Sequence, residues 1–397
     1  MNSNLNNLDF KSFLMAGFEC SYPLVRNQER WDLLRDSTHE PYLAQDYARI
    51  KELGIRTVRE GMAWHQIDKG GGHYDFSRFE QMMRIAHEQG IQQIWDLNHY
   101  DYPEYLDPFS NSFIDAFAGY ALNCAKIIRK YQSGTIYLVL INEISYWAWI
   151  GADLGEWAPY SKGVENGIKF KAQLIKATIA ATDAIKKADG DIRFIQVDPF
   201  MYREAIEPAS EQARSAARDF NTIARFQTWD MLSGKAFPEL GGKPEYLDIL
   251  GINYYVDNQQ WLLSSDDQKH IQFERVPIDH PKRKSVGEML AQIIPRYERP
   301  LLITETGSYG DYRKPWWKRF LCEIEECLGN GIPLYGVCAY PTLDNPDEGH
   351  FLAPHSGLWD FRQDDAAFQR IPHESSIALI RDFQKRLSLA RGATQPM

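Results

Sequence analysis

The sequence predicts an α/β protein folded as a closed (β/α)8 TIM barrel, and three observations support this. Short apolar runs rich in β-branched residues alternate with longer segments of helical period along the whole chain. Eight such runs occur, which is the number of strands in a barrel of this kind. No G-x-G-x-x-G turn follows the first run, which argues against an open nucleotide-binding sheet. We therefore expect one catalytic domain over residues 1–397, with its core at about 13–390.

Each expected strand is a short apolar run bounded by polar or turn-forming residues. The eight runs lie at residues 13–18, 55–60, 91–97, 136–141, 192–197, 247–253, 300–304 and 333–340. Segments that read as irregular follow the third, fourth, sixth and eighth runs. Because the loops after the strands of a barrel share one face, we expect the binding site on that face.

The intervening segments have the apolar spacing of amphipathic helices. Residues 42–54 place apolar side chains on one face and end at a glycine, and residues 79–90 behave alike. The longest helical segment, residues 167–190, carries Leu174 and Ile185 along one stripe and also ends at a glycine. We interpret these stripes as the faces that pack against the barrel.

Composition and charge exclude several classes of protein. A net charge of −10, with lysine and arginine scattered along the chain, argues against a nucleic-acid partner and favours a small neutral substrate. The first residues do not resemble a signal peptide, and no stretch approaches the roughly 20 apolar residues of a membrane span. We expect a cytoplasmic protein without a membrane partner. The five dispersed cysteines lack the spacing of a zinc site or a disulfide framework, so we expect reduced thiols.

Two glutamates follow the ends of expected strands. Glu143 comes after IYLVLI and Asn142, at the end of the fourth strand, and Glu305 holds the matching place on the seventh. An isolated acid at a strand end is usually a salt-bridge partner or a helix cap. Strands four and seven of a closed barrel face each other across its mouth, so these two side chains can converge there. Two convergent carboxylates are what cleavage of a glycosidic bond needs.

At these residues the chain resembles the clan A glycoside hydrolases, and is most similar to the family 1 β-glycosidases. The family carries N-E-P at its acid/base glutamate, where this chain has Asn142 and Glu143 followed by Ile144. The family's nucleophile motif I-T-E-N-G corresponds to ITETG around Glu305, with Thr306 as the one difference.

Further motifs extend the resemblance over about residues 13–360. HYDYP is similar to the family's H-W-D-L-P and matches its sugar-binding histidine to His99. GINYY resembles the strand-six motif and supplies Asn253 and Tyr255, the tyrosine that hydrogen-bonds the nucleophile. Arg59 in TVREGMAW holds the place of the arginine that keeps the nucleophile ionised.

The resemblance implies a retaining β-glycoside hydrolase that needs no cofactor and no metal. Arg59 and Tyr255 would hold the pKa of Glu305 low. Glu143, which is flanked by Tyr146, Trp147 and Trp149, would have a raised pKa and stay protonated. Asn142 would donate to the 2-hydroxyl of the sugar. His99 would bind sugar, although a strand-end histidine satisfied within the fold is the other interpretation.

The residues that recognise sugar hydroxyls depart from the family pattern. The family has W-S-L-L-D-N-F-E-W after strand eight, where this chain has Y-P-T-L-D-N-P-D-E, from Tyr340 to Glu348. The family's A-x-Q-x-E-G segment after strand one is absent, and GFECSYP offers Glu19 and Tyr22. The family's Trp-Ser bond is cis, so we predict a cis bond between Tyr340 and Pro341.

Four tryptophans on the same loops are candidate stacking platforms for a sugar or aglycone ring, and core packing is an equal interpretation for each. They are Trp147, Trp149, Trp157 and Trp261.

The expected partner is a small-molecule or oligosaccharide glycoside, and two alternative functions remain open. One is a retaining transglycosylase that uses the same site. The other is a catalytically degenerate barrel that binds carbohydrate or a protein, which the altered segment after strand eight suggests. The sequence leaves the sugar, the aglycone, the linkage and the oligomeric state open.

Overall fold

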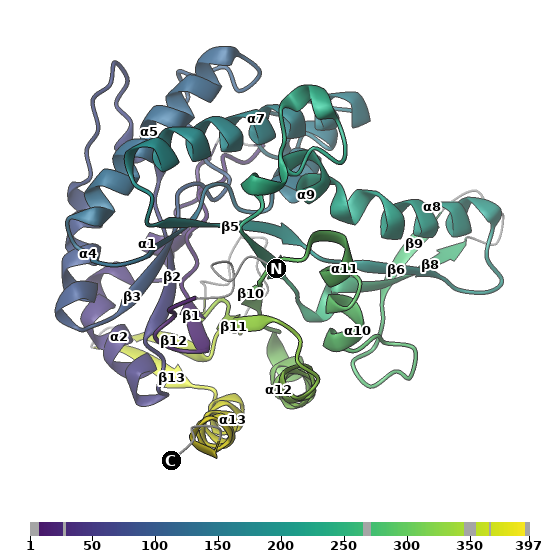
Figure 1. Ribbon diagram of the computed structural model, residues 1–397. Coiled ribbons are helices and arrows are strands. Elements are labelled where there is room, and N and C mark those ends of the chain that lie inside the picture. The colour runs from purple at the N-terminus through teal and green to yellow at the C-terminus, as the bar shows by residue number, and fades with distance from the viewer. Residues whose placement is uncertain (1–7, 27–28, 265–270, 345–354, 365–366, 394–397) are drawn as a thin grey trace.

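Eight parallel strands close into a barrel in the computed structural model of the chain (Figure 1), which describes residues 8–26, 29–264, 271–344, 355–364 and 367–393. Around the barrel the strand order is β1-β11-β10-β7-β5-β4-β3-β2. The strands are β1 (Leu14–Gly17), β2 (Thr57–Gly61), β3 (Gln92–Asp96), β4 (Ile136–Val139), β5 (Ile192–Pro199), β7 (Ile249–Asn253), β10 (Leu301–Thr306) and β11 (Leu334–Ala339). All eight predicted strands are present, so the predicted barrel is confirmed.

The barrel strands are buried on both faces, which explains their nearly continuous apolar sequences. Side chains that point inward fill the barrel, and they include Met15, Ile94, Tyr137, Val197 and Leu302. The alternate side chains point outward and pack against the helices in one large core. The barrel is therefore a packed wall that fixes the directions of the residues at its strand ends.

Helices cover the outside of the barrel. The predicted amphipathic segments form α2 (Leu43–Glu52), α4 (Ser77–Glu88) and α7 (Val164–Ala188), with α5 (Asn111–Arg129), α12 (Arg313–Gly329) and α13 (Glu374–Ala393) beside them. The other α-helices are α1 (Leu33–Asp36), α3 (Trp64–Ile67), α6 (Ile144–Trp147), α8 (Glu211–Thr222), α9 (Gln227–Leu232), α10 (Val286–Leu290) and α11 (Ile294–Tyr297). Single 3-10 turns lie at Glu40–Tyr42, Ala224–Phe226, Pro238–Leu240, Pro244–Tyr246, Val256–Asn258 and Gly310–Tyr312.

Two segments that read as irregular in the sequence are ordered elements. After β7 the chain forms β8 (Gln259–Ser264) and β9 (Ile271–Arg275), an antiparallel pair that β6 (Tyr202–Ala205) extends to three strands. Figure 1 shows this small sheet and α8 together on the side of the barrel away from α2 and α4. After β4 the chain continues into α6 and a π-helical turn, Ala148–Asp153. The prediction of irregular structure at these two places is wrong. The short apolar runs there do not continue the alternation of barrel strands and helices, so they were not recognised as strands or helical turns.

A hairpin of β12 (Trp359–Asp364) and β13 (Ala367–Pro372) lies between the last barrel strand and α13. All five cysteines are free thiols. Within the described residues, no helix combines the length and the apolar character that a membrane crossing requires.

Candidate active site

The two glutamates singled out in the sequence line one pocket at the C-terminal ends of the barrel strands. The pocket has a volume of about 390 Å³, and Glu19, His99, Tyr255 and Tyr340 line it together with Glu143 and Glu305. The remaining lining residues are Tyr100, Tyr146, Pro199, Met201, Val256, Asp257, Asn258, Gly307, Ser308, Tyr309, Pro341 and Ser356. Seven barrel strands or the loops that follow them thus contribute to one concave site, as expected for this fold.

Glu305 is held by one cation and one phenol. Arg59 Nη1 donates to Oε1 of Glu305 at 2.5 Å, and the Tyr255 hydroxyl donates to Oε2 at 2.7 Å. Arg59 reaches across from β2, and Tyr255 comes from the turn after the neighbouring strand β7, so residues far apart in sequence fix both oxygens. A carboxylate bound in this way is oriented for attack on a group in the pocket.

Arg59 is almost wholly buried, and its guanidinium uses all of its hydrogen-bond donors within the protein. Its Nε and Nη2 donate to the two oxygens of Asp96 at 3.0 and 2.7 Å, and Nη2 also donates to Oδ1 of Asn142 at 2.8 Å. Its Nη1 donates to the Thr304 carbonyl at 3.1 Å in addition to Glu305. Five N–H groups therefore make five bonds, which locks Arg59 in place.

Glu143 has a different environment, made only of neutral donors. The Tyr100 hydroxyl donates to Oε2 at 2.6 Å, and Nδ2 of Asn253 donates to Oε1 at 2.9 Å. The backbone of Glu143 is left-handed, with φ 45° and ψ 59°, a costly conformation for a residue with a Cβ. Tyr100 is not among the residues predicted from the sequence, although it lies directly after His99 in the HYDYP motif.

The pKa values of the two carboxyl groups follow from these environments. Burial and then the negative charge of Glu305 raise the pKa of Glu143 to about 7, although Tyr100 and Asn253 act to lower it. Burial also raises the pKa of Glu305, against the lowering effects of the charges of Arg59 and His99 and the hydrogen bond from Tyr255. The predicted lowering for Glu305 is wrong in direction, because burial outweighs its cationic neighbours. Since Glu305 alone contacts a guanidinium, the negative charge of the pair lies on Glu305 first.

Asn142 connects the two halves of the site. Its Oδ1 accepts from Arg59 and, at 3.3 Å, from Asn253, so its Nδ2 must face the other way. Nδ2 lies 2.7 Å from Nε2 of His99 and donates to the Tyr100 hydroxyl at 3.2 Å. Asn142 is fully buried and both its N–H groups are used, so contact with a sugar hydroxyl requires one of these bonds to be exchanged.

The same network assigns the tautomer of His99. Its Nδ1 lies 3.2 Å from Oδ2 of Asp96, which can only accept, so Nδ1 carries the proton in the neutral ring. Nε2 then accepts from Asn142. The hydrogen bond to Asp96 and the charges of Glu19 and Asp96 raise the pKa of His99 against the lowering effect of burial. His99 therefore presents an oriented ring edge to the pocket.

Glu19 and Tyr340 form part of the pocket wall as the sequence predicts, and the Tyr340–Pro341 bond is cis, which confirms that prediction. The Arg59 guanidinium lies 5.3 Å from the centre of the Tyr340 ring. Gly17 leaves room for this ring, because a Cβ at that position would lie 2.2 Å from Cδ2 of Tyr340. Glu348 lies outside the described residues.

The tryptophans proposed as stacking platforms do not line the pocket. Trp147 is buried, donates to the Ala158 carbonyl and packs against Phe170, so it is a core residue. Trp149 is 47% exposed, and its ring lies 5.7 Å from that of the lining residue Tyr146 without lining the pocket itself. Trp157 is buried beneath the pocket, and Trp261 lies in the small three-stranded sheet. Core packing, the other interpretation offered by the sequence, describes Trp147, and stacking of the other three against a ligand ring stays a prediction.

Two groups of described residues bring three possible metal ligands within 4.8 Å of one another. Cys20, Asp96 and His99 form one group, but Asp96 is bound by Arg59 and burial raises the pKa of the Cys20 thiol, which disfavours the thiolate that a metal needs. In the other group, Asp344 accepts from the backbone of residues 355 and 356, and Asp360 pairs with Arg313. Both groups therefore serve the fold through hydrogen bonds.

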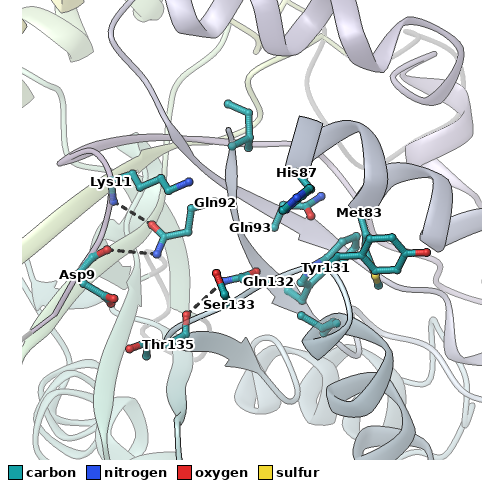
Figure 2. Close-up of a pocket in the computed structure, with 13 residues that line it drawn as sticks. Asp9, Lys11, Met83, His87, Gln92, Gln93, Tyr131, Gln132, Ser133 and Thr135 are labelled. Carbon is teal, nitrogen blue, oxygen red and sulfur yellow. Dashed lines mark hydrogen bonds between the residues drawn. The ribbon is translucent and has the colours of Figure 1, made fainter. Parts of the chain in front are cut away.

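A second pocket, of about 240 Å³, lies at the opposite end of the barrel (Figure 2). It is lined by the residues that precede β1, by the start of β3 and by the turn before β4. Figure 2 shows the Gln92 side chain bonded to the backbone of Asp9 and Lys11 beside it. None of the residues singled out for chemistry lines this pocket, and the N-terminal face of a barrel serves mainly stability.

Comparison with known proteins identifies the family. Residues 24–240 match the model of glycosyl hydrolase family 1. An aryl-phospho-beta-D-glucosidase of Bacillus subtilis is 20% identical over 391 residues, which covers 77% of each chain. A beta-glucosidase from Thermotoga maritima has the same fold, with a TM-score of 0.74, 17% identity and 95% and 98% of the two chains covered. The AHE enzyme from Alicyclobacillus herbarius is similar, with a TM-score of 0.73, 17% identity and 96% and 100% covered. Because the family match spans more than half of the chain, the protein belongs to glycosyl hydrolase family 1 and is a glycoside hydrolase.

Proposed function

We propose that the protein hydrolyses β-glycosides with retention of configuration, with Glu305 as nucleophile and Glu143 as acid and then base. One observation carries this proposal: two carboxyl groups line the same pocket, and only one of them contacts a cation. The names of the similar proteins, a phospho-β-glucosidase and β-glucosidases, support the β-linkage.

In the first step, an oxygen of Glu305 attacks the anomeric carbon and the bond to the aglycone oxygen breaks. The proton of Glu143 passes to that oxygen, and a glycosyl ester on Glu305 forms. In the second step, water attacks the anomeric carbon, Glu143 takes a proton from the water, and the ester bond breaks. With a pKa of about 7, Glu143 can serve as the acid and then as the base near neutral pH.

The surrounding residues support the two steps. Arg59 and Tyr255 orient Glu305 and stabilise the negative charge that it regains when the ester breaks. Asn253 donates to Oε1 of Glu143 and Tyr100 donates to Oε2, so the two together orient the carboxyl group that exchanges the proton. We assign His99, Tyr340 and Glu19 to contacts with the sugar, since all three line the pocket. Asn142 orients His99 and joins it to Arg59.

The test combines turnover with the detection of the intermediate. Glu305→Ala should abolish release of nitrophenol from aryl β-glycosides, and a 2-fluoro glycoside with a good leaving group should add one sugar mass to the wild type at Glu305. Glu165→Ala removes an exposed carboxylate of α7 and should leave turnover unchanged.

Proton NMR of the first product formed decides retention, because the β-anomer must appear before the α-anomer. Full activity of the Glu305→Ala variant would contradict the assignment of the nucleophile. Added alcohols distinguish a transglycosylase, which would transfer most of the sugar to them. Binding of glycosides without release of sugar from any of a broad panel would favour the degenerate barrel.

A further inference from the structure

The walls of the active-site pocket are acidic. Four carboxyl groups line it, those of Glu19, Glu143, Asp257 and Glu305, and none of its described lining residues is lysine or arginine. The charged groups that line the described part of this pocket are therefore acceptors of hydrogen bonds, and none is the cation of a lysine or arginine.

Arg59 and Arg275, two arginines near the pocket, are already paired with acids of the protein. All five N–H groups of Arg59 donate to acceptors of the protein. Arg59 therefore cannot bind a ligand without breaking a buried hydrogen bond or ion pair. Arg275, on β9, donates to Asp257 at 3.2 Å and to the Tyr309 hydroxyl at 2.9 Å, and it lies 4.1 Å from the centre of the Tyr312 ring. Its charge thus compensates an acid of the pocket wall.

Glu19 is the acid that the two catalytic steps do not use. Its side chain is 4% exposed, and its Oε1 accepts from the backbone N–H of Ser21 at 3.0 Å, the one hydrogen bond that the described residues give it. The negative charge of Glu19 contributes to the raised pKa values of His99, Tyr340 and Glu305, so it lies near all three. A buried carboxylate with free acceptor capacity beside the nucleophile is costly unless a ligand donates to it.

We propose that Glu19 binds hydroxyl groups of the sugar ring and that the pocket takes an uncharged glycon and rejects a phosphorylated one. This inference rests on the proposed function. A carboxylate can accept hydrogen bonds from two neighbouring hydroxyl groups. Such hydrogen bonds to a charged acceptor are stronger than hydrogen bonds between neutral groups. A phosphate in the same place meets carboxylates, and none of the described lining residues is a lysine or arginine, which is a repulsive element against anionic sugars. The similar protein from Bacillus subtilis is named for phosphorylated substrates, so this chain would differ from it in substrate class.

The experiment compares matched substrates on the whole protein. The kcat/KM is measured for 4-nitrophenyl β-glucoside and β-galactoside and for the 6-phosphate of each. We expect the better unphosphorylated compound to exceed both phosphates by at least about a hundredfold. The Glu19→Gln variant keeps an acceptor for the backbone N–H of Ser21 and hence the fold. In this variant we expect kcat/KM for the unphosphorylated compound to fall at least about tenfold. We also expect the ratio of kcat/KM between the unphosphorylated compound and its 6-phosphate to become smaller.

Glu165→Gln is the control, because it changes the net charge equally at an exposed position of α7 and should leave the preference unchanged. Equal or faster turnover of a phosphate by the wild type overturns the inference while leaving the hydrolase assignment intact. An unchanged preference in Glu19→Gln overturns the role of Glu19. Absence of turnover for all four compounds, and for the broader panel above, instead overturns the proposed function.

Discussion

Replacing Tyr100 with phenylalanine tests how the protein sets the pKa of its acid. The Tyr100 hydroxyl donates to Oε2 of Glu143, and this bond stabilises the ionised carboxylate, so it lowers the pKa. Tyr100→Phe keeps the ring, which packs against Trp157, and removes the hydroxyl that donates to Glu143 and accepts from Asn142. The pKa of Glu143 should therefore rise.

The size of the shift follows from the bond that is lost. A hydrogen bond to a charged group contributes about 1.5–3 kcal/mol, and one pKa unit corresponds to about 1.4 kcal/mol. The Asn253 donor remains on the other oxygen. We expect the pKa to move from about 7 to roughly 8.

The assay is the pH profile of kcat/KM with an aryl β-glycoside. Glu143 acts as an acid only while protonated, so activity falls as pH rises through its pKa, and a higher pKa moves this alkaline limb to higher pH. Tyr146→Phe is the matched control, since Tyr146 lines the same pocket but makes no hydrogen bond to Glu143. An alkaline limb that stays in place, or moves to lower pH, would refute the reasoning.

Three further substitutions test the chemistry and the fold. Glu143→Gln should lose about 10²–10⁴ in kcat for poor leaving groups but much less for 2,4-dinitrophenol, because a good leaving group needs no proton; the alkaline limb should disappear from its pH profile. Arg59→Met leaves two buried carboxylates uncompensated and should lower the free energy of unfolding by about 3–5 kcal/mol, measured by urea denaturation. Gly251→Ala places a Cβ 2.6 Å from Cγ2 of Val197 inside the barrel and should destabilise it by about 1–3 kcal/mol, measured by thermal unfolding.

For each of the three substitutions, one result would contradict the expected outcome. Equal losses for good and poor leaving groups would argue against Glu143 as the acid. If the Arg59→Met protein were as stable as the wild type, Asp96 and Glu305 would not depend on Arg59 to compensate their negative charges. A Gly251→Ala protein with unchanged stability would mean that the interior layer has room to repack.

The positions of the catalytic candidates could be read from the sequence because they are local properties. A strand inside a barrel reads as a short apolar run, and a side chain directly after it lies at the barrel mouth. This placed Glu143 and Glu305 at one face before any contact was known, and both line the same pocket. The short strands β8 and β9 were missed, because they interrupt the repeat rather than continue it.

The environments of those candidates could not be read in the same way. The pKa of Glu305 was predicted to be low from the presence of Arg59, but the depth of burial decides the direction and belongs to the folded chain. Trp147 and Trp149 follow Glu143 in sequence and lie in the helical turns after β4, yet neither lines the pocket.

The sequence by itself determined the barrel, the two acids at its mouth and the residues similar to family 1. Only the tertiary structure decided that Tyr100 donates to Glu143, that Arg59 has no donor left for a ligand and that Glu19 lies beside the nucleophile with acceptor capacity to spare. The physical reason is the separation along the chain over which each interaction acts. Strand periodicity acts between neighbours in the chain, whereas hydrogen bonds, burial and charge act between side chains that meet only when the barrel closes.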